Sequence, residues 1–456
     1  MRPVSAAWVA EVTHGTLSGA AEGLITSVER DSRECGPGAL YVAFPGERAD
    51  GHDFVEAAAT AGAALHLVTR PVSRPHVLVS DAVEAIGLLA AAYLSLLRSE
   101  GDITVIGITG SVGKTTTKDL LAHILPDCVA PVGSFNNEIG LPLTVLRAGP
   151  GTRYLVLEMG ASGVGHIAYL TRIAPPDVVV VLVVGSAHLG EYASLDEVAD
   201  AKAEIILGRT EGAAVLLNAD DPRVAAMAKL APGAWTFGVG NGDVRAEGLD
   251  TVEARANFTL LGPDGTSAPV ALRLVGEHQV TNALAAAAVA LSCGMTVPDV
   301  AARLNSATPL SEHRMAVTVR PDGVTVIDDS YNASPESMRA ALRALRDLAG
   351  AGRSVAVLGE MLEMGAGSIA AHDELGALAV RLGIGHVVMV GQGTRPAYDA
   401  AVREGSFGDE AAFAATIDEA RAHLSGWLAP GDTVLVKASH GTGLWRLADE
   451  LAGGAA

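Results

Sequence analysis

A glycine-rich turn between an apolar strand and a helix constrains the fold of this chain more than any other feature. The apolar residues 103–108 run into Gly107-Ile-Thr-Gly110-Ser-Val-Gly113-Lys114-Thr115, and a helical pattern over residues 116–125 follows. Further strands, separated by helices, are predicted near residues 154–157, 178–184 and 213–217. This order of elements is typical of a doubly wound parallel sheet. The central part of the chain is therefore predicted to be an α/β domain.

The turn has the chemistry of a phosphate-binding loop. Backbone N–H groups of such a loop approach phosphate oxygens, and the helix N-terminus adds a favourable dipole. Lys114 can neutralise the β- and γ-phosphates, and the Thr115 hydroxyl can hold Mg²⁺. The strict pattern has glycine where Ile108 stands, so a chance glycine turn with an exposed lysine is the alternative. The predicted nucleotide-binding residues of this loop are Gly110, Ser111, Gly113, Lys114, Thr115 and Thr116.

Two more polar side chains follow strands that are predicted to neighbour this loop. Glu158 ends the strand at 154–157, and His188 follows the apolar run at 178–184. Ligands bind at the carboxyl ends of the strands in open α/β sheets, and carboxylate oxygens suit Mg²⁺. A solvated loop glutamate and a turn histidine bonded to backbone are the structural alternatives. Glu158 and His188 are therefore candidate metal ligands.

Lys202 falls on the apolar side of a predicted helix. Ser194-Leu-Asp-Glu197 has the spacing of a capping box, which starts a helix at residue 195. The apolar stripe of this helix consists of Leu195, Val198, Ala199, Ile205 and Ile206. At about 100° per residue Lys202 lies within that stripe, where an ammonium must extend to water, pair with a carboxylate or lose its charge. The functional alternative is that its amine reacts with CO₂ to give a carbamate, an anionic ligand for a second metal.

Another cluster of polar residues follows a strand in the last third of the chain. The run at 324–327 leads into Asp328-Asp329-Ser-Tyr331-Asn332-Ala-Ser334-Pro335, where Ser334 can cap the next helix. Acidic groups here could bind a ribose, and Tyr331 or Asn332 could contact a base, or the segment could be a capped surface turn. Asn282, near another helix start, could cap that helix or bind an adenine edge. The spacing alone leaves these alternatives open.

Length and element pattern predict three domains. At roughly 150 residues per domain, 456 residues are enough for about three cores. We expect a small α/β domain over residues 1–100, a central P-loop domain over 101–312 and a Rossmann-like α/β domain over 313–456. Alternating runs at 252–260 and 270–274 enclose Gly-Pro-Asp-Gly, which predicts a hairpin.

The composition argues against several classes of protein. The net charge is −20 and only 4% of residues are aromatic, which argues against a nucleic-acid-binding surface. The longest strongly apolar run, residues 178–184, is about a third of the ~20 residues that span a bilayer, and the N-terminus lacks the pattern of a signal peptide. Cys35, Cys128 and Cys293 lack metal-binding spacing. We expect a cytoplasmic protein without membrane insertion.

Longer motifs resemble those of the Mur ligase family over essentially the whole chain. They occur in the family's order, as TGSVGKTTTKD (109–119), EMGASGVGHI (158–167), GSAHLGEY (185–192), ADAKAEI (199–205), NADDPRV (218–224), GEHQVTNALAA (276–286), EHRM (312–315) and DDSYNASPESM (328–338). The segment at 31–54 is similar to the uridine-diphosphate-binding domain of two branches of the family. SFNNEIGLPLTVL at 134–146 and GEMLEMG at 359–365 resemble the branch that adds D-alanyl-D-alanine.

The resemblance implies an ATP-dependent ligase of peptidoglycan precursor synthesis. Such an enzyme adds D-alanyl-D-alanine to UDP-N-acetylmuramoyl-tripeptide through an acyl phosphate, with ATP and Mg²⁺ as cofactors. We expect a monomer with two metal sites, one of them formed through carbamylated Lys202. The implied residues are Lys114, His188 and Lys202 for catalysis, Thr115, Glu158, His188 and Lys202 for metal, Asn282, Arg314, Asp329, Tyr331 and Asn332 for the nucleotide, and Ser32, Arg33, Asn136 and Asn137 for the substrate.

Two departures and three rival functions accompany this resemblance. Gln279 and His440 stand where the family motifs have asparagine and arginine, which leaves their roles open. One rival is a ligase of the same fold with another amino acceptor, such as the diaminopimelate-adding branch, whose DNPR tetrapeptide is absent, or a folylpolyglutamate synthase. The others are a nucleotide-dependent switch without ligase activity, although the guanine-binding NKxD tetrapeptide is missing, and a structural protein with an inactive site.

Overall fold

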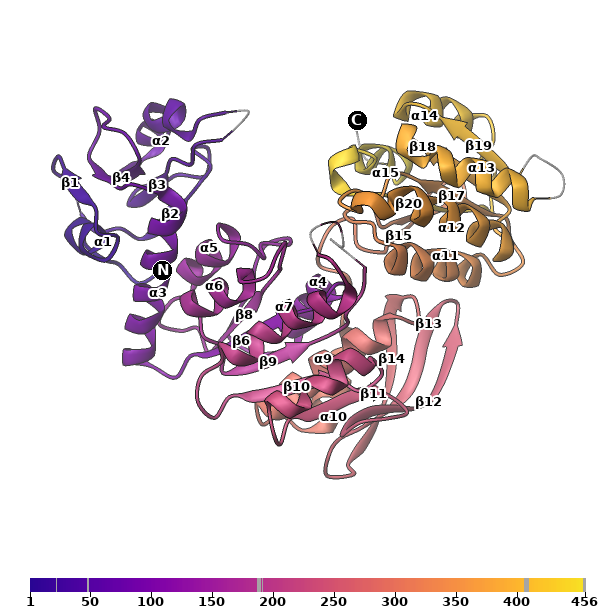
Figure 1. Ribbon diagram of the computed structural model, residues 1–456, viewed down its shortest axis with the longest axis horizontal. Helices are drawn as coiled ribbons and strands as arrows, with labels where there is room; N and C mark the ends of the chain where they lie inside the picture. Colours follow the sequence, from indigo (N-terminus) through magenta and orange to yellow (C-terminus); the bar gives the residue numbers. More distant parts are fainter. Residues whose placement is uncertain (22, 47–48, 187–189, 191, 406–409, 454–456) are drawn as a thin grey trace.

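The computed structural model describes residues 1–456 except residues 22, 47–48, 187–189, 191, 406–409 and 454–456. The described chain forms three β-sheets, of five, nine and six strands. In Figure 1 the indigo N-terminal part and the orange C-terminal part lie at opposite ends of the magenta central part. The prediction of three α/β domains is confirmed, and the central domain is the one that contacts both others.

The N-terminal sheet has the order β1-β5-β4-β3-β2, with β1 antiparallel to β5 and the other pairs parallel. Its strands are β1 (Thr16–Ser18), β2 (Ser27–Glu29), β3 (Ala39–Val42), β4 (Ala63–Val68) and β5 (His76–Leu78), and the helices are α1 (Ala6–Val12), α2 (Val55–Ala61) and α3 (Ala82–Glu100). Leu40, Leu65 and Leu67 are fully buried. Because parallel strands are covered on both faces, their apolar runs were visible in the sequence.

Helix α3 joins the N-terminal sheet to the central domain. Asp81 caps it by accepting hydrogen bonds from the N–H groups of Val83 and Glu84. By length and composition it could cross a membrane, but half of the apolar window is buried inside the protein. Its apolar side chains belong to one hydrophobic cluster with residues of both adjoining sheets. The apolar character of α3 is therefore accounted for by packing between two domains.

The central sheet has the order β14-β13-β12-β11-β10-β9-β6-β8-β7. Strands β6 to β12 all run parallel to one another, whereas the pairs β12–β13 and β13–β14 are antiparallel. Its strands are β6 (Thr104–Thr109), β7 (Cys128–Val129), β8 (Tyr154–Glu158), β9 (Val178–Val181), β10 (Ala214–Asn218), β11 (Trp235–Val239), β12 (Val244–Val252), β13 (Arg255–Leu261) and β14 (Ser267–Val275). Strand β6 lies between β8 and β9, so the carboxyl ends of these three strands meet.

The helices of the central domain cover this sheet, and the predicted hairpin is present as β13 and β14. They are α4 (Lys114–Ile124), α5 (Gly140–Arg147), α6 (His166–Ile173), α7 (Leu195–Leu207), α8 (Pro222–Ala225), α9 (Gln279–Ser292) and α10 (Val297–Ser306). Helix α9 begins at Gln279, one turn before Asn282, so the alternative that Asn282 caps this helix is wrong. Strand β9 ends at Val181, three residues earlier than the apolar run suggested.

The C-terminal sheet has the order β15-β16-β20-β17-β18-β19 and is parallel except for β15. Its strands are β15 (Ala316–Val319), β16 (Thr325–Asp328), β17 (Ser354–Leu358), β18 (His386–Val390), β19 (Ala411–Ala414) and β20 (Thr433–Lys437), and its helices are α11 (Pro335–Ala349), α12 (Ser368–Arg381), α13 (Arg395–Glu404), α14 (Ile417–Ser425) and α15 (Trp445–Leu451). Ser334 caps α11 with Pro335 in its first turn, as predicted. The last strand, β20, lies between β16 and β17, and its carboxyl end adjoins theirs.

Candidate active site

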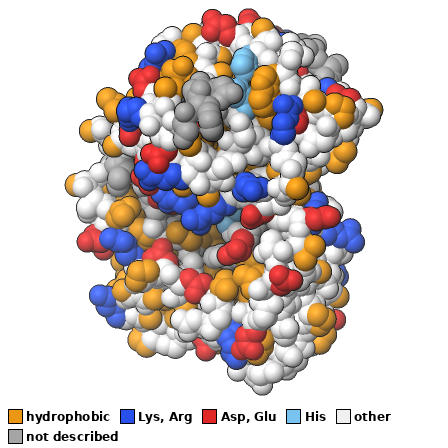
Figure 2. All heavy atoms as spheres, turned by 90° about the vertical axis from the view of Figure 1, so that its right-hand side faces the viewer, with side chains coloured by type: hydrophobic (Ala, Val, Ile, Leu, Met, Phe, Trp, Pro, Cys, Tyr) orange, Lys and Arg blue, Asp and Glu red, His pale blue; other side chains and the backbone are white. Residues whose placement is uncertain are grey.

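The carboxyl ends of the central and C-terminal sheets face one cavity of about 550 Å³. In Figure 2 it corresponds to the hollow between the upper and lower halves of the molecule, where Lys, Arg, Asp and Glu side chains gather. The predicted residues that line it are Ser111, Gly113, Lys114, Thr115, Thr116, Asn136, Glu158, Asn282, Arg314, Asp329, Tyr331 and Asn332. Side chains predicted from separate motifs thus meet in one place.

The glycine-rich turn leads directly from β6 into α4. Gly113 has φ 88°, and a Cβ there would lie 2.3 Å from Asn282 Oδ1, so a side chain at this position would be both strained and crowded. Ile108 is fully buried within β6. A glycine is not needed at 108 because the chain is still a strand there, which explains the departure from the strict P-loop pattern.

Lys114 and Glu158 bring opposite charges to the loop. Lys114 Nζ donates a hydrogen bond to the Gly110 carbonyl at 2.5 Å. Glu158 is fully buried at the end of β8, where Oε2 accepts a hydrogen bond from the Thr115 hydroxyl at 3.2 Å and Oε1 has no partner among the residues that the structure describes. Burial raises the pKa of Glu158, while the charges of Lys114, Lys118 and Arg314 oppose that shift. Burial has the opposite effect on Lys114, whose pKa it lowers, because it disfavours the charged form of each group.

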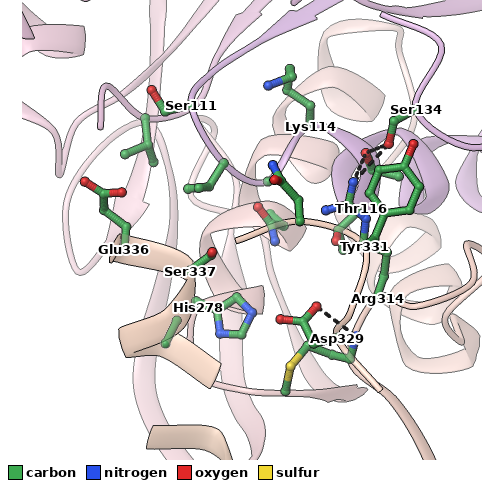
Figure 3. Close-up of a pocket in the computed structure, with 18 of the residues that line it drawn as sticks. Ser111, Lys114, Thr116, Ser134, His278, Arg314, Asp329, Tyr331, Glu336 and Ser337 are labelled. Carbon is green, nitrogen blue, oxygen red and sulfur yellow. Dashed lines mark hydrogen bonds between the residues drawn. The ribbon is translucent and has the colours of Figure 1, made fainter. Parts of the chain in front are cut away.

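Arg314 connects the two walls of the cavity. Its Nη2 donates to Ser134 Oγ at 2.9 Å and to Thr115 Oγ1 at 3.3 Å, and its guanidinium lies 4.2 Å from the centre of the Tyr331 ring. Its Nε is buried and has no hydrogen-bond partner in the described part of the chain. Figure 3 shows Arg314, Ser134 and Tyr331 together on one side of the cavity. This cation therefore reaches the phosphate-binding loop from the segment that enters the C-terminal domain.

Lys202 does not extend to solvent. Ser194 caps α7 as predicted, and Lys202 is 5% exposed on the buried face of that helix. Among the residues that the structure describes, no hydrogen bond or ion pair of its amine is found. Burial, reinforced by the charge of Lys114, lowers the pKa of Lys202 to about 7. An amine of this kind is substantially neutral near physiological pH, which is the form that can react with CO₂.

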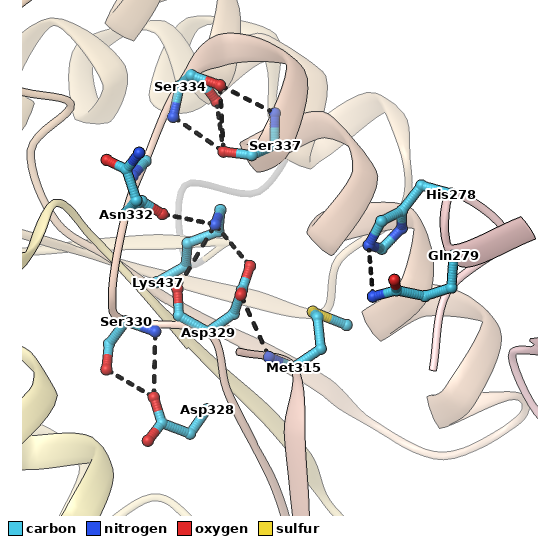
Figure 4. Close-up of polar contacts among 11 residues, drawn as sticks. His278, Gln279, Met315, Asp328, Asp329, Ser330, Asn332, Ser334, Ser337 and Lys437 are labelled. Atoms are coloured by element: carbon cyan, nitrogen blue, oxygen red, sulfur yellow. Dashed lines mark hydrogen bonds and ion pairs between the residues drawn. The ribbon is translucent and has the colours of Figure 1, made fainter. Parts of the chain in front are cut away.

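Asp329 is held by a lysine that the sequence did not single out. Lys437, at the end of β20, is 2% exposed and donates to Asp329 Oδ2 at 2.5 Å and to the Asn332 carbonyl at 2.8 Å (Figure 4). Asp329 Oδ1 accepts a hydrogen bond from Met315 N–H at 3.2 Å. Burial lowers the pKa of Lys437 and the charge of Asp329 opposes that shift. The strand-end segment after β16 is therefore tied to the neighbouring strand.

The two residues that depart from the family motifs both line the cavity. Gln279 Oε1 accepts a hydrogen bond from Asn282 Nδ2 at 2.8 Å, so it fixes the orientation of that amide. His440 stacks on Trp445 with ring centres 5.8 Å apart and lies 5.2 Å from Tyr331. His278, beside Gln279, also lines the cavity, and burial lowers its pKa to about 4.

Several predicted residues lie elsewhere. His188 falls outside the described residues. Ser32 and Arg33 follow β2 in the N-terminal domain, where Arg33 pairs with Asp31, and neither lines the cavity. Asn137 Oδ1 accepts hydrogen bonds from the N–H groups at the start of α5, whereas its neighbour Asn136 lines the cavity. The substrate-binding residues that we predicted are thus divided between two domains.

Models of three Mur ligase domains match the chain. The Mur ligase family catalytic domain matches residues 24–93, the Mur ligase middle domain residues 108–290, and the Mur ligase glutamate ligase domain residues 313–440. A protein of Mycobacterium tuberculosis named "UDP-N-acetylmuramoyl-tripeptide--D-alanyl-D-alanine ligase" is 47% identical over 99% of this chain and 98% of its own length. A protein of the same name from Escherichia coli is 36% identical over 86% of this chain and 87% of its own.

Solved structures agree with this likeness. MurF of Acinetobacter baumannii superposes with a TM-score of 0.87 at 31% identity, covering 99% of each chain. MurF of Thermotoga maritima in complex with ADP gives a TM-score of 0.80 at 31% identity, covering 94% of this chain and 97% of that one. The family models, the full-length relatives and the cavity between two α/β domains lead to one conclusion: the chain belongs to the Mur ligase family.

Proposed function

We propose that this protein is the ATP-dependent ligase that joins D-alanyl-D-alanine to UDP-N-acetylmuramoyl-tripeptide, giving the pentapeptide precursor of peptidoglycan, ADP and phosphate. The observation that carries the proposal is the cavity in which the P-loop and Glu158 meet Arg314 and other side chains of the C-terminal domain. The full-length likeness to ligases of this name, at 47% identity, supports the choice of substrates. The likeness to an ADP complex of MurF supports the nucleotide.

The nucleotide is proposed to lie across the two walls of the cavity. Lys114 and Arg314 would neutralise phosphate oxygens, because both line the cavity, Lys114 as part of the loop and Arg314 through its hydrogen bond to Thr115. Asp329 would accept hydrogen bonds from the ribose, and Asn282 would contact the base, with Tyr331 and Asn332 nearby. The backbone N–H groups of residues 112–116 would bind phosphate at the start of α4, whereas Ser111 N–H already donates to the Val183 carbonyl.

The residues present fit Mg²⁺. Glu158 Oε1 is a buried carboxylate oxygen to which no described residue donates, and Thr115 Oγ1 lies 3.2 Å from the other carboxylate oxygen. We propose Thr115, Glu158, His188 and a carbamate on Lys202 as the ligands of two magnesium sites. Bound Mg²⁺ would supply charge stabilisation for the transferring phosphoryl group. The lowered pKa of Lys202 supports the carbamate, since only the neutral amine attacks CO₂.

The proposed reaction has two steps. The terminal carboxylate of the tripeptide attacks the γ-phosphate of ATP in line, and ADP leaves, while Lys114 and Arg314 stabilise the negative charge. The amine of D-alanyl-D-alanine then attacks the acyl carbon and displaces phosphate. Because water would hydrolyse the acyl phosphate, closing the C-terminal domain over the loop protects the intermediate.

The remaining expectations belong to the same proposal. Ser32 and Arg33 would bind the UDP-sugar end of the substrate in a domain of residues 1–100, and Asn136 and Asn137 would face its peptide. The central and C-terminal domains would comprise residues 101–312 and 313–456. We also propose that the enzyme acts as a monomer in the cytoplasm without membrane insertion.

A panel of amino acceptors tests the proposed substrate. The protein is incubated with ATP, Mg²⁺ and UDP-N-acetylmuramoyl-tripeptide, and the product mass is determined with D-alanyl-D-alanine, D-alanine, diaminopimelate or glutamate. We expect the mass of one added dipeptide only with D-alanyl-D-alanine. A product with another acceptor in its place would show a different ligase of the same fold, and ATP turnover without any product would indicate a nucleotide switch.

A further inference from the structure

Glu336 brings a carboxylate from the C-terminal domain to the edge of the phosphate-binding loop. It lies in the first turn of α11, and its Oε1 accepts a hydrogen bond from Ser186 N–H of the central domain at 2.8 Å. Ser111 of the loop both donates to the Gly185 carbonyl at 3.0 Å and accepts from Gly185 N–H at 2.8 Å. Figure 3 shows Glu336 beside Ser111, opposite Arg314 and Tyr331. The loop therefore positions the segment that holds Glu336.

Two polar atoms at this contact are buried and have no hydrogen-bond partner in the described part of the chain. They are Glu336 Oε2 and Ser186 Oγ. Buried polar atoms normally form hydrogen bonds, so a carboxylate oxygen and a hydroxyl that both lack a partner among the described residues indicate a donor supplied by a ligand. A carboxylate oxygen accepts hydrogen bonds and favours a positive charge. The matching ligand group is a cation with several N–H donors, which describes an ammonium.

The other carboxylates of the cavity are committed elsewhere. Asp329 is paired with Lys437. Glu158 shares its oxygens between Thr115 and the proposed metal. Glu363 also lines the cavity and already has an interaction partner. Glu336 is therefore the carboxylate best placed to receive a positively charged substrate group next to the phosphate-binding loop.

We propose that Glu336 Oε2 and Ser186 Oγ bind the ammonium of the acceptor dipeptide and that Glu336 accepts the proton that it loses before attack. This assignment rests on the proposed ligase function. One proton of the ammonium passes to Glu336 and then to water, and the freed nitrogen lone pair forms the N–C bond with the acyl carbon. The C–O bond of the acyl phosphate breaks, its electron pair leaves with phosphate, and phosphate takes the second proton that the nitrogen loses.

The test separates the two half-reactions in the full-length protein. Glu336→Gln keeps an oxygen for Ser186 N–H but presents an amide in place of the charged oxygen. We expect the KM for D-alanyl-D-alanine to rise about 10- to 100-fold, the range for losing a hydrogen bond to a charged group, with the KM values for ATP and the tripeptide substrate unchanged. Ser186→Ala should raise the same KM by a smaller factor and leaves every carboxylate in place.

Hydroxylamine provides the second measurement, because it is uncharged at neutral pH and needs neither an ammonium site nor a proton acceptor. With ATP and the tripeptide substrate but no dipeptide, Glu336→Gln should form the hydroxamate as fast as the wild type. Asp347→Asn, at the exposed far end of α11, is the matched control and should leave both nucleophiles unaffected.

Three outcomes would overturn the inference, and each leads to a different conclusion. If Glu336→Gln retains the wild-type KM for the dipeptide, Glu336 does not bind the ammonium. If it loses hydroxamate formation as well, Glu336 acts in the first half-reaction by holding the loop. If the wild-type protein itself forms neither hydroxamate nor dipeptide product, the proposed function fails and the inference fails with it.

Discussion

On the central-domain wall of the cavity, Lys114 and Glu158 are not in ion-pair contact among the described residues, whereas on the C-terminal wall Lys437 and Asp329 form a buried ion pair. Lys114 donates only to a backbone carbonyl, and Glu158 Oε1 has no partner among the described residues. On the opposite wall Lys437 is bound to Asp329. Burying an unpaired charge is costly, so the first wall is built for a ligand that supplies the missing charges. On the second wall the Lys437–Asp329 pair holds the loops in place, and Glu336 is the group there that keeps an oxygen for a ligand.

The largest effect is expected from Lys114, the unpaired cation of the first wall. Lys114→Ala removes the group that neutralises the phosphates and should lower kcat by about 10²–10³-fold, as measured by phosphate release with all three substrates. Lys229→Ala, an exposed lysine of the same domain, is the control. An undiminished rate in Lys114→Ala would remove the loop from the mechanism.

Lys202 provides a second test of the central-domain wall. Lys202→Ala should lose about 10²-fold in activity because the proposed carbamate ligand is gone. Short-chain carboxylic acids added to the assay should restore part of that activity, since they can place a carboxylate in the space that the side chain vacates. Full activity without such acids would rule out the carbamate.

Substituting Lys437 tests how much the buried ion pair of the C-terminal wall contributes to stability. Removing one partner of a buried ion pair leaves the other charge uncompensated, so Lys437→Ala should lower the free energy of unfolding by about 3–5 kcal/mol in denaturant titration. Arg381→Ala breaks the exposed pair with Glu404 and should change it by less than about 1 kcal/mol. If the two variants lose the same stability, the proposed difference between the walls is wrong.

His278 gives a smaller, pH-dependent effect. Burial lowers the pKa of His278 from 6.5 to about 4, with the charge of Asp329 opposing the shift and that of Lys437 adding to it. Between these pH values the unfolded chain binds a proton that the folded protein does not, so stability rises with pH by at most about 1.4 kcal/mol per unit. His278→Gln should show a flatter dependence of unfolding free energy on pH across this window. Identical slopes would contradict a neutral His278 in the folded protein.

The fold was predictable where strands are buried and parallel. Every residue of β17, β18 and β20 is buried, and each strand contains a continuous apolar run, at residues 355–358, 387–390 and 434–436. β1 was not predicted, because all three of its residues are exposed at a sheet edge and show no apolar pattern. The position of β20 between β16 and β17 was also out of reach, because strand order depends on contacts between distant parts of the chain.

The site shows the same difference between features that a local pattern identifies and features that depend on distant parts of the chain. Lys114 and Glu158 were found because a local pattern, a glycine-rich turn or a strand end, identifies each of them. Lys437 and Glu336 were not, because their significance comes from partners 108 and 150 residues away in the sequence. A lysine at the end of an apolar strand and a glutamate in a first helical turn are ordinary features by themselves.

The most direct test of the account is the dependence of ATP cleavage on both substrates. Phosphate release by the wild-type protein is measured with ATP and Mg²⁺ alone, with the tripeptide substrate, with D-alanyl-D-alanine, and with both. We predict sustained release only when both are present, because the acyl phosphate forms on one substrate and is consumed by the other. Steady ATP turnover that ignores the dipeptide would contradict a ligase and would favour a nucleotide-dependent switch.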